Sequence, residues 1–125
     1  MITIKQEGNF KNTERFFSRA QNLRLHTILE NYGRKGVAAL ASATPKDTGE
    51  TASSWDYKIS ITQKGYTISW INRHEENGIM PAILIQYGHG TGTGGYIQGL
   101  DYINPAMKPI FDDVANAISK EVSNL

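Results

Sequence analysis

The sequence predicts an α+β fold in which helices and strands occupy separate parts of the chain. Apolar residues recur at helical spacing before residue 44 and again after residue 104, but alternate with polar residues between positions 55 and 70. Isoleucine outnumbers leucine, 14 to 7, and this bias toward β-branched residues favours sheet. We therefore expect N-terminal helices, one of them long, and a C-terminal helix packed on a small, mainly antiparallel sheet.

The composition is that of one domain, residues 1–125. The chain has 13 Lys and Arg, 12 Asp and Glu, and no Cys. It is too short for a TIM barrel or a two-domain dinucleotide enzyme, and it has no thiolate for a metal site or a nucleophile. Its net charge of +1 provides no strong field for holding nucleic acid or an anionic membrane. Met1–Lys5 is too polar for a signal peptide and the longest apolar stretch, Ala82–Ile85, is too short to span a bilayer, so we expect a soluble protein with no membrane partner.

The first third of the chain begins with a short strand. Ile2 and Ile4 alternate with polar neighbours within Met1–Lys5. Asn12 or Thr13 then caps a helix that begins Glu14-Arg15-Phe16-Phe17. A second cap at Asn22 predicts that this short helix leads into a longer one.

The long helix has an apolar face with helical spacing, formed by Leu25, Ile28, Leu29, Tyr32, Val37, Leu40 and Ala43. Gly33 and Gly36 lie within it, so they either kink the helix or let another backbone approach closely. Pro45 disfavours helical geometry at Thr44, which predicts that the helix ends near Ala43.

Three strands are predicted next. Residues 55–61 and 66–70 alternate apolar and polar residues and are joined by a loop at 63–65, which is typical of a hairpin. After a charged connection at 73–78, Ala82–Tyr87 is a nearly continuous apolar run and predicts a strand buried on both faces. The hairpin aromatics are expected to form the core face of the sheet; they are Trp55, Tyr57, Tyr66 and Trp70.

The chain ends with a glycine-rich loop and a helix. Six of the 12 glycines fall between Gly88 and Gly99, and we expect a flexible loop at about 88–100, followed by extended chain from Ile97 to Ile103. Asn104 caps the last helix and Pro105 occupies its first turn. The apolar stripe of this helix is Met107, Ile110, Phe111, Val114, Ile118 and Val122.

The search for catalytic patterns gives little. His26, His74 and His89 lie on different elements and none belongs to an H-E-x-x-H pair. His74-Glu75-Glu76 could act in acid–base chemistry or metal binding, but adjacent residues in a charged loop usually form a solvated face. We therefore expect no catalytic residue, metal or cofactor, and a protein that is not an enzyme.

The glycine-rich loop could in principle hold an anion with its backbone N–H groups. It lacks the Lys-Ser/Thr end of a P-loop, and Thr93 stands where a dinucleotide fingerprint needs its third glycine. An enzyme with an anion site there remains a weaker hypothesis. We favour a docking arm that becomes ordered on assembly, with its interaction residues at Tyr87, Gly88, His89, Gly92, Gly95, Tyr96 and Ile97.

The alternative function is a nucleic-acid-binding module. Its basic residues would be Arg15, Arg19, Arg24, Arg34 and Lys35 on the N-terminal helices, and the aromatic residues of the sheet would stack on bases. Glu14 and Glu30 interrupt the basic residues, which weakens this hypothesis.

Three segments in order resemble a known family. They are Ala43-Thr44-Pro45-Lys46-Asp47-Thr48-Gly49 after a long helix, Ile85-Gln86-Tyr87-Gly88 before a glycine-rich excursion, and Tyr102-Ile103-Asn104-Pro105-Ala106 opening a final helix. Over residues 12–122 the chain is similar to the tail-component family typified by phage Hong Kong 97, the neck or tail-completion proteins of siphophages. Where that family often has Arg-Pro-Phe, this chain has Ile103-Asn104-Pro105.

The resemblance implies a structural role without catalysis. A subunit this small would form a ring, a homo-hexamer by analogy with the family, around the channel that joins head and tail, and DNA would pass without sequence-specific binding. Other connector, terminator or tail-tube proteins would be its partners, in the virion and during assembly in the bacterial cytoplasm. The segment after the long helix would form a rigid corner, with an Asx turn and a positive φ at its glycine, made of Thr44, Pro45, Asp47, Thr48 and Gly49.

Overall fold

The computed structural model describes residues 2–7, 19–45, 49–62 and 65–123. It confirms the predicted α+β class, with helices packed against a small antiparallel sheet. In chain order the elements are β1 (Ile2–Glu7), α1 (Arg19–Ala43), a 3-10 turn η1 (Ala52–Ser54), β2 (Trp55–Thr62), β3 (Gly65–Asn72), α2 (Pro81–Tyr87), β4 (Gly88–Gly90), β5 (Tyr96–Gln98) and α3 (Ile103–Ser123).

The main sheet has the order β1-β3-β2 and is antiparallel throughout. The predicted hairpin is confirmed, with Trp55 opposite Asn72 at one end and Thr62 opposite Gly65 at the other. The predicted N-terminal strand is also confirmed, and pairs with β3 so that Ile2 lies opposite Trp70. Burial alternates along β3, as expected for a strand with one face on the core.

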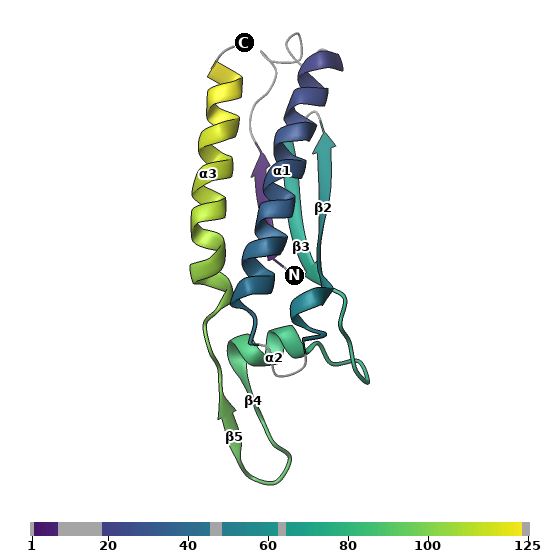
Figure 1. The fold of residues 1–125 in the computed structure, drawn as a ribbon, viewed down its shortest axis with the longest axis vertical. Helices are drawn as coiled ribbons and strands as arrows, with labels where there is room; N and C mark the ends of the chain where they lie inside the picture. The colour runs from purple at the N-terminus through teal and green to yellow at the C-terminus, as the bar shows by residue number, and fades with distance from the viewer. Residues whose placement is uncertain (1, 8–18, 46–48, 63–64, 124–125) are drawn as a thin grey trace.

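Helices α1 and α3 cover one face of this sheet, and Figure 1 shows α1 in front of the strands with α3 beside it. The predicted aromatic core face is confirmed, because Trp55, Tyr66 and Trp70 are buried. The Trp70 ring lies 6.1 Å from that of Phe111 on α3, so α3 also reaches the sheet. The largest fully buried apolar side chains come from α1, β3 and α3 and are Trp70, Leu29, Leu40, Ile68, Met107 and Val114.

The two glycines of α1 allow a close approach, but of aromatic side chains rather than of another backbone. A Cβ at Gly33 would lie 2.6 Å from Cε2 of Tyr57, and one at Gly36 would lie 2.5 Å from Cε2 of Trp70. The Trp70 indole N–H donates to the Gly33 carbonyl at 2.9 Å. The helix therefore packs tightly on the sheet where it has no side chains, and it runs unbroken through both positions.

Two predictions for the part of the chain before residue 88 are wrong. Asn22 does not cap a second helix, because α1 already begins at Arg19; the short helix predicted from Glu14 lies outside the described residues. Ala82–Tyr87 is not a strand but lies within α2, since a short apolar run fits a buried helix as well as a strand. Pro81 starts this helix at a position where its missing N–H costs nothing, and Gly88 ends it with a φ of 80°.

The C-terminal helix has the predicted stripe but not the predicted cap. Met107, Val114 and Ile118 are buried and Pro109 is accommodated within the helix, while the side chain of Val122 lies outside what the structure describes. Helix α3 begins at Ile103, so Asn104 and Pro105 both lie inside its first turn. Among the described residues, no helix is both long and apolar enough to cross a membrane.

Candidate functional site

The corner after α1 is built around the buried hydroxyl of Thr44. This hydroxyl donates to the Leu40 carbonyl at 2.6 Å and accepts the indole N–H of Trp55 at 2.9 Å. It therefore joins the end of α1 to the start of β2. The predicted positive φ of Gly49 is confirmed at 62°, whereas the predicted Asx turn at Asp47 and Thr48 lies outside the described residues.

The segment predicted as a flexible loop at 88–100 is a regular hairpin, here called the arm (residues 88–100). Strands β4 and β5 pair antiparallel, with His89 opposite Ile97 and Gly90 opposite Tyr96. At the tip the Thr91 N–H donates to the Gly95 carbonyl at 3.1 Å. The arm extends beyond the helical body at one end of the molecule (Figure 1). Of the extended chain predicted from Ile97 to Ile103, only the first residues form a strand, and Ile103 is helical.

Two glycines bring the two sides of the arm together at its base. A Cβ at Gly88 would lie 2.6 Å from the backbone N of Gly99, and one at Gly99 would lie 2.5 Å from the Gln86 carbonyl oxygen. Side chains at these two positions would separate the two sides of the arm. Close packing of the two backbones therefore explains why these positions are glycine. An anion site is not needed to explain them.

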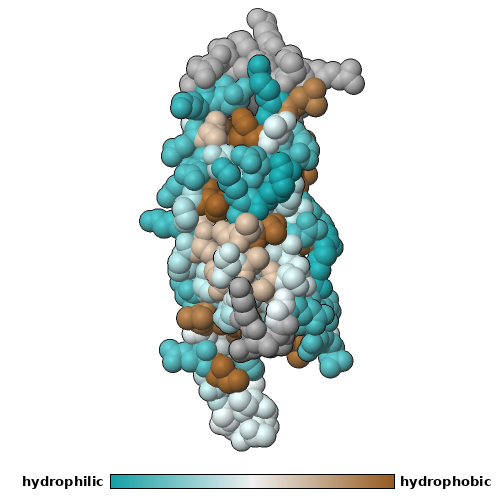
Figure 2. All heavy atoms as spheres, in the orientation of Figure 1, coloured by the Kyte–Doolittle hydropathy of each residue, from teal (hydrophilic) through white to brown (hydrophobic). Residues whose placement is uncertain are grey.

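The arm and the last residue of α2, directly before it, carry four of the six large apolar side chains that the described residues expose. Tyr87, Tyr96, Ile97 and Leu100 are 69%, 67%, 52% and 56% exposed. Figure 2 shows brown, hydrophobic atoms near the base of the arm and a pale tip of intermediate hydropathy. Within the described part of the chain, the Nδ1 atom of His89 is buried with no hydrogen-bond partner. Clustered exposed apolar residues of this kind are typical of interaction surfaces.

A single amide connects the base of the arm to helix α3. The Gln86 Oε1 atom accepts the backbone N–H groups of Tyr102 at 3.1 Å and Ile103 at 3.0 Å. Its Nε2 atom donates to Asp101 Oδ1 at 2.7 Å. The N-terminal cap that was expected from Asn104 is therefore supplied by Gln86, from another helix.

The residues proposed for nucleic-acid binding are largely engaged elsewhere. The sheet aromatics are covered by helices and cannot stack on bases. Arg24 pairs with Glu121 at 3.0 Å, and Lys35 Nζ lies 4.9 Å from the centre of the Tyr32 ring. Arg34 lies 3.9 Å from Glu30, while Arg15 and the side chain of Arg19 lie outside what the structure describes.

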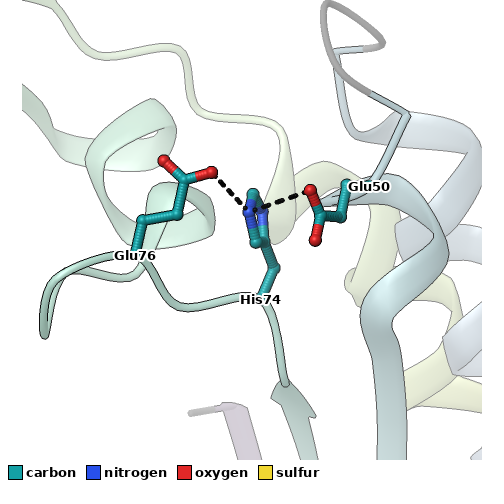
Figure 3. A group of neighbouring side chains, drawn as sticks. All are labelled: Glu50, His74 and Glu76. Carbon is teal, nitrogen blue, oxygen red and sulfur yellow. Dashed lines mark hydrogen bonds and ion pairs between the residues drawn. The ribbon is translucent and has the colours of Figure 1, made fainter.

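A second group of polar side chains gathers around His74, next to the corner. The imidazole is buried, and its Nε2 atom lies 3.1 Å from Glu76 Oε1 and 3.4 Å from Glu50 Oε2. Figure 3 shows the two carboxylates converging on the same edge of the ring. On the other edge, Nδ1 lies 2.7 Å from Thr51 Oγ1. This set of N and O atoms has the donor types that a divalent cation requires.

The sequence pattern indicated part of this group. The charged segment His74-Glu75-Glu76 indicated that a histidine and a glutamate lie close together. No local pattern links them to Glu50, which the corner after α1 brings across from a distant part of the chain. The exposed Leu100 at the end of the arm has no local sequence signal that marks it as an interaction residue.

Comparison with known proteins yields no relative for this chain: no family model, curated protein or solved structure matches it.

Proposed function

We propose that the protein is a structural component of a phage or prophage that joins head to tail, as a neck or tail-completion ring. The observation that carries the proposal is the arm, a hairpin that extends beyond the body and bears three exposed large apolar side chains, with a fourth, Tyr87, directly before it. Such a projection suits a subunit that completes its fold against a neighbour.

The order of elements supports the same proposal. The three segments that resemble the tail-component family lie at the ends of α1 and α2 and at the start of α3. Each is a junction: Thr44 ties α1 to β2, Gly88 starts the arm, and Ile103 receives the cap from Gln86. A subunit repeated around a ring needs such fixed junctions, because a small angular error at each interface prevents closure.

In the proposed ring, the arm of one subunit packs on the body of the next in a head-to-tail contact. Six subunits are what the family resemblance implies. The net charge of +1 suits a channel through which DNA moves, since strong phosphate binding would hold it. We do not favour the nucleic-acid-binding module, because its sheet aromatics are core residues.

Light scattering after size exclusion, together with negative-stain electron microscopy, tests the ring. We expect closed rings with a mass six times the 13.9 kDa of the subunit. The double variant Ile97→Ser, Leu100→Ser removes exposed apolar side chains from the arm, and should give folded monomers. Deletion of 91–95 should likewise leave the subunit folded but impair assembly.

Leu23 provides the matched control. It is 64% exposed and lies in the first turns of α1, at the end of the molecule opposite the arm (Figure 1). Leu23→Ser removes a comparable apolar side chain and should leave the ring intact. A monomer at every concentration, or rings that survive the double arm variant, would contradict the proposal.

A further inference from the structure

His74 is held in place by buried partners on neighbouring segments. Its backbone N–H donates to Asn72 Oδ1 at 3.0 Å, and the Asn72 amide donates to the Thr51 carbonyl at 2.8 Å. Thr51 in turn contacts the ring at Nδ1. The imidazole is therefore fixed in orientation before anything binds to its other nitrogen, as is typical of histidine ligands.

The Nε2 edge of this ring faces negative charge from two directions. Both carboxylates are mostly exposed, whereas the ring they face is buried, with 5% of the side chain accessible. The neighbouring cation, Arg73, donates to Asp56 Oδ2 at 2.8 Å and 3.0 Å. It therefore does not neutralise the carboxylates of Glu50 and Glu76. In the tautomer whose Nδ1–H donates to Thr51, the Nε2 lone pair faces two carboxylates, and a cation between the three groups would offset their repulsion.

The distances match those of a metal site. Ligand atoms about 2.1 Å from a tetrahedral metal lie about 3.4 Å from one another. Here the Nε2 atom lies 3.1 Å and 3.4 Å from the two oxygens, and all three atoms lie within 4.8 Å of one another. Both glutamates are mostly exposed, so their carboxylates have room to adjust around a cation.

We propose that Glu50, His74 and Glu76 bind a divalent transition-metal cation, with Zn²⁺ as the best fit. The proposal is independent of the ring and of the arm. One imidazole and two carboxylates suit a borderline cation better than Mg²⁺ or Ca²⁺, which prefer oxygen ligands alone. Because both glutamates are exposed to solvent, water can bind the cation as a further ligand.

Such a cation would join two segments that are distant in the chain. Glu50 belongs to the corner after α1, whereas His74 and Glu76 belong to the connection between β3 and α2. Bound metal would therefore stabilise the corner against the start of α2, and the stability of the protein would rise with metal concentration.

Calorimetric titration of the full chain with zinc chloride tests the site directly. We expect one Zn²⁺ per chain and tighter binding than for Mn²⁺ or Mg²⁺. Glu50→Gln and Glu76→Gln should each weaken Zn²⁺ binding by about tenfold or more, and both positions are exposed, so these variants should fold. In a nitrogen-15 spectrum of the wild type, Zn²⁺ should shift the Nε2 resonance of His74.

Two control variants separate this site from adventitious binding. Glu75→Gln removes an exposed carboxylate adjacent in sequence but outside the group, and should bind Zn²⁺ like the wild type. His26→Ala removes the pair that His26 forms with Glu30 at 3.6 Å on α1 and should also leave the affinity unchanged. The proposal is overturned if Zn²⁺ does not saturate the wild type, if Glu50→Gln and Glu76→Gln keep its affinity, or if His26→Ala loses it. It is also overturned if a proton stays on Nε2 when Zn²⁺ is in excess, because the group would then be an ion-paired imidazolium only.

Discussion

Replacing Gly36 with alanine tests how closely α1 packs on the sheet. Alanine is the better helix former by about 1 kcal/mol, so on an exposed helix face this substitution would stabilise the protein. At Gly36 the added Cβ would lie 2.5 Å from Cε2 and 2.7 Å from Cζ2 of Trp70. The indole is fully buried and hydrogen-bonded to Gly33, so it cannot move aside freely.

The expected magnitude follows from three contributions. Overpacking a well-filled core costs about 1–3 kcal/mol. Displacement of the indole would also leave its buried N–H without the Gly33 carbonyl, at a cost of about 1–3 kcal/mol. After the gain in helix propensity is subtracted, we expect Gly36→Ala to lower the free energy of unfolding by about 3 kcal/mol, and the melting temperature by roughly 10 °C.

Urea unfolding followed by tryptophan fluorescence measures this change. Asn31→Ala is the matched control, because Asn31 is an exposed residue of the same helix; it should stabilise the protein slightly through helix propensity alone. A Trp70→Phe background provides a second test. There the cost of Gly36→Ala should fall by about 1 kcal/mol or more, since the smaller ring relieves the clash.

The reasoning is refuted if Gly36→Ala is as stable as the wild type or more stable. That result would mean that helix propensity dominates and that α1 can move away from the sheet without loss. An equal cost of Gly36→Ala in the Trp70→Phe background would show that the clash with the indole is not its cause.

Three further predictions concern the corner and the junction with α3. Gly49→Val should cost more than about 1 kcal/mol of stability in urea unfolding, because its φ is 62° while the space around it is open; Gly49→Asn should cost less, and equal costs would contradict this. Gln86→Leu should cost about 2 kcal/mol or more by thermal unfolding, since the N–H groups of Tyr102 and Ile103 lose their acceptor; a neutral result would mean that water replaces it. Burial raises the pKa of Tyr102 to about 12 from 10.0, so only the unfolded state deprotonates as the pH rises through 10, and stability should fall by up to about 2–3 kcal/mol by pH 12. Tyr102→Phe should lack this component in urea titrations at pH 9 to 12, and parallel pH profiles for the two proteins would refute it.

Local periodicity was sufficient to predict the parts of the fold that depend on one buried face. The stripes of α1 and α3 and the alternation in β2 and β3 specify which side of each element faces the core, and these predictions are confirmed. Gly36 also indicated a close approach, although its partner, the indole of Trp70, could not be identified from local pattern.

The failures share a physical cause, which is that the deciding contact is distant in the chain or the segment is very short. The run after Pro81 is too short for its period to distinguish a helix from a strand. The cap of α3 comes from Gln86 and not from Asn104, and Glu50 reaches His74 only through the folded corner. The arm was predicted as a loop because its strands have three residues each and two of the three residues of β4 are glycine.

The closed base of the arm has a consequence for how the protein could diversify. The Leu100 N–H donates to the Ile85 carbonyl at 2.8 Å, and the Gln86 amide contacts Asp101 just beyond it. These bonds complete the junction without any contribution from the tip at 91–95. The length and sequence of the tip can therefore vary to match a new neighbour while the helices and the main sheet keep their packing.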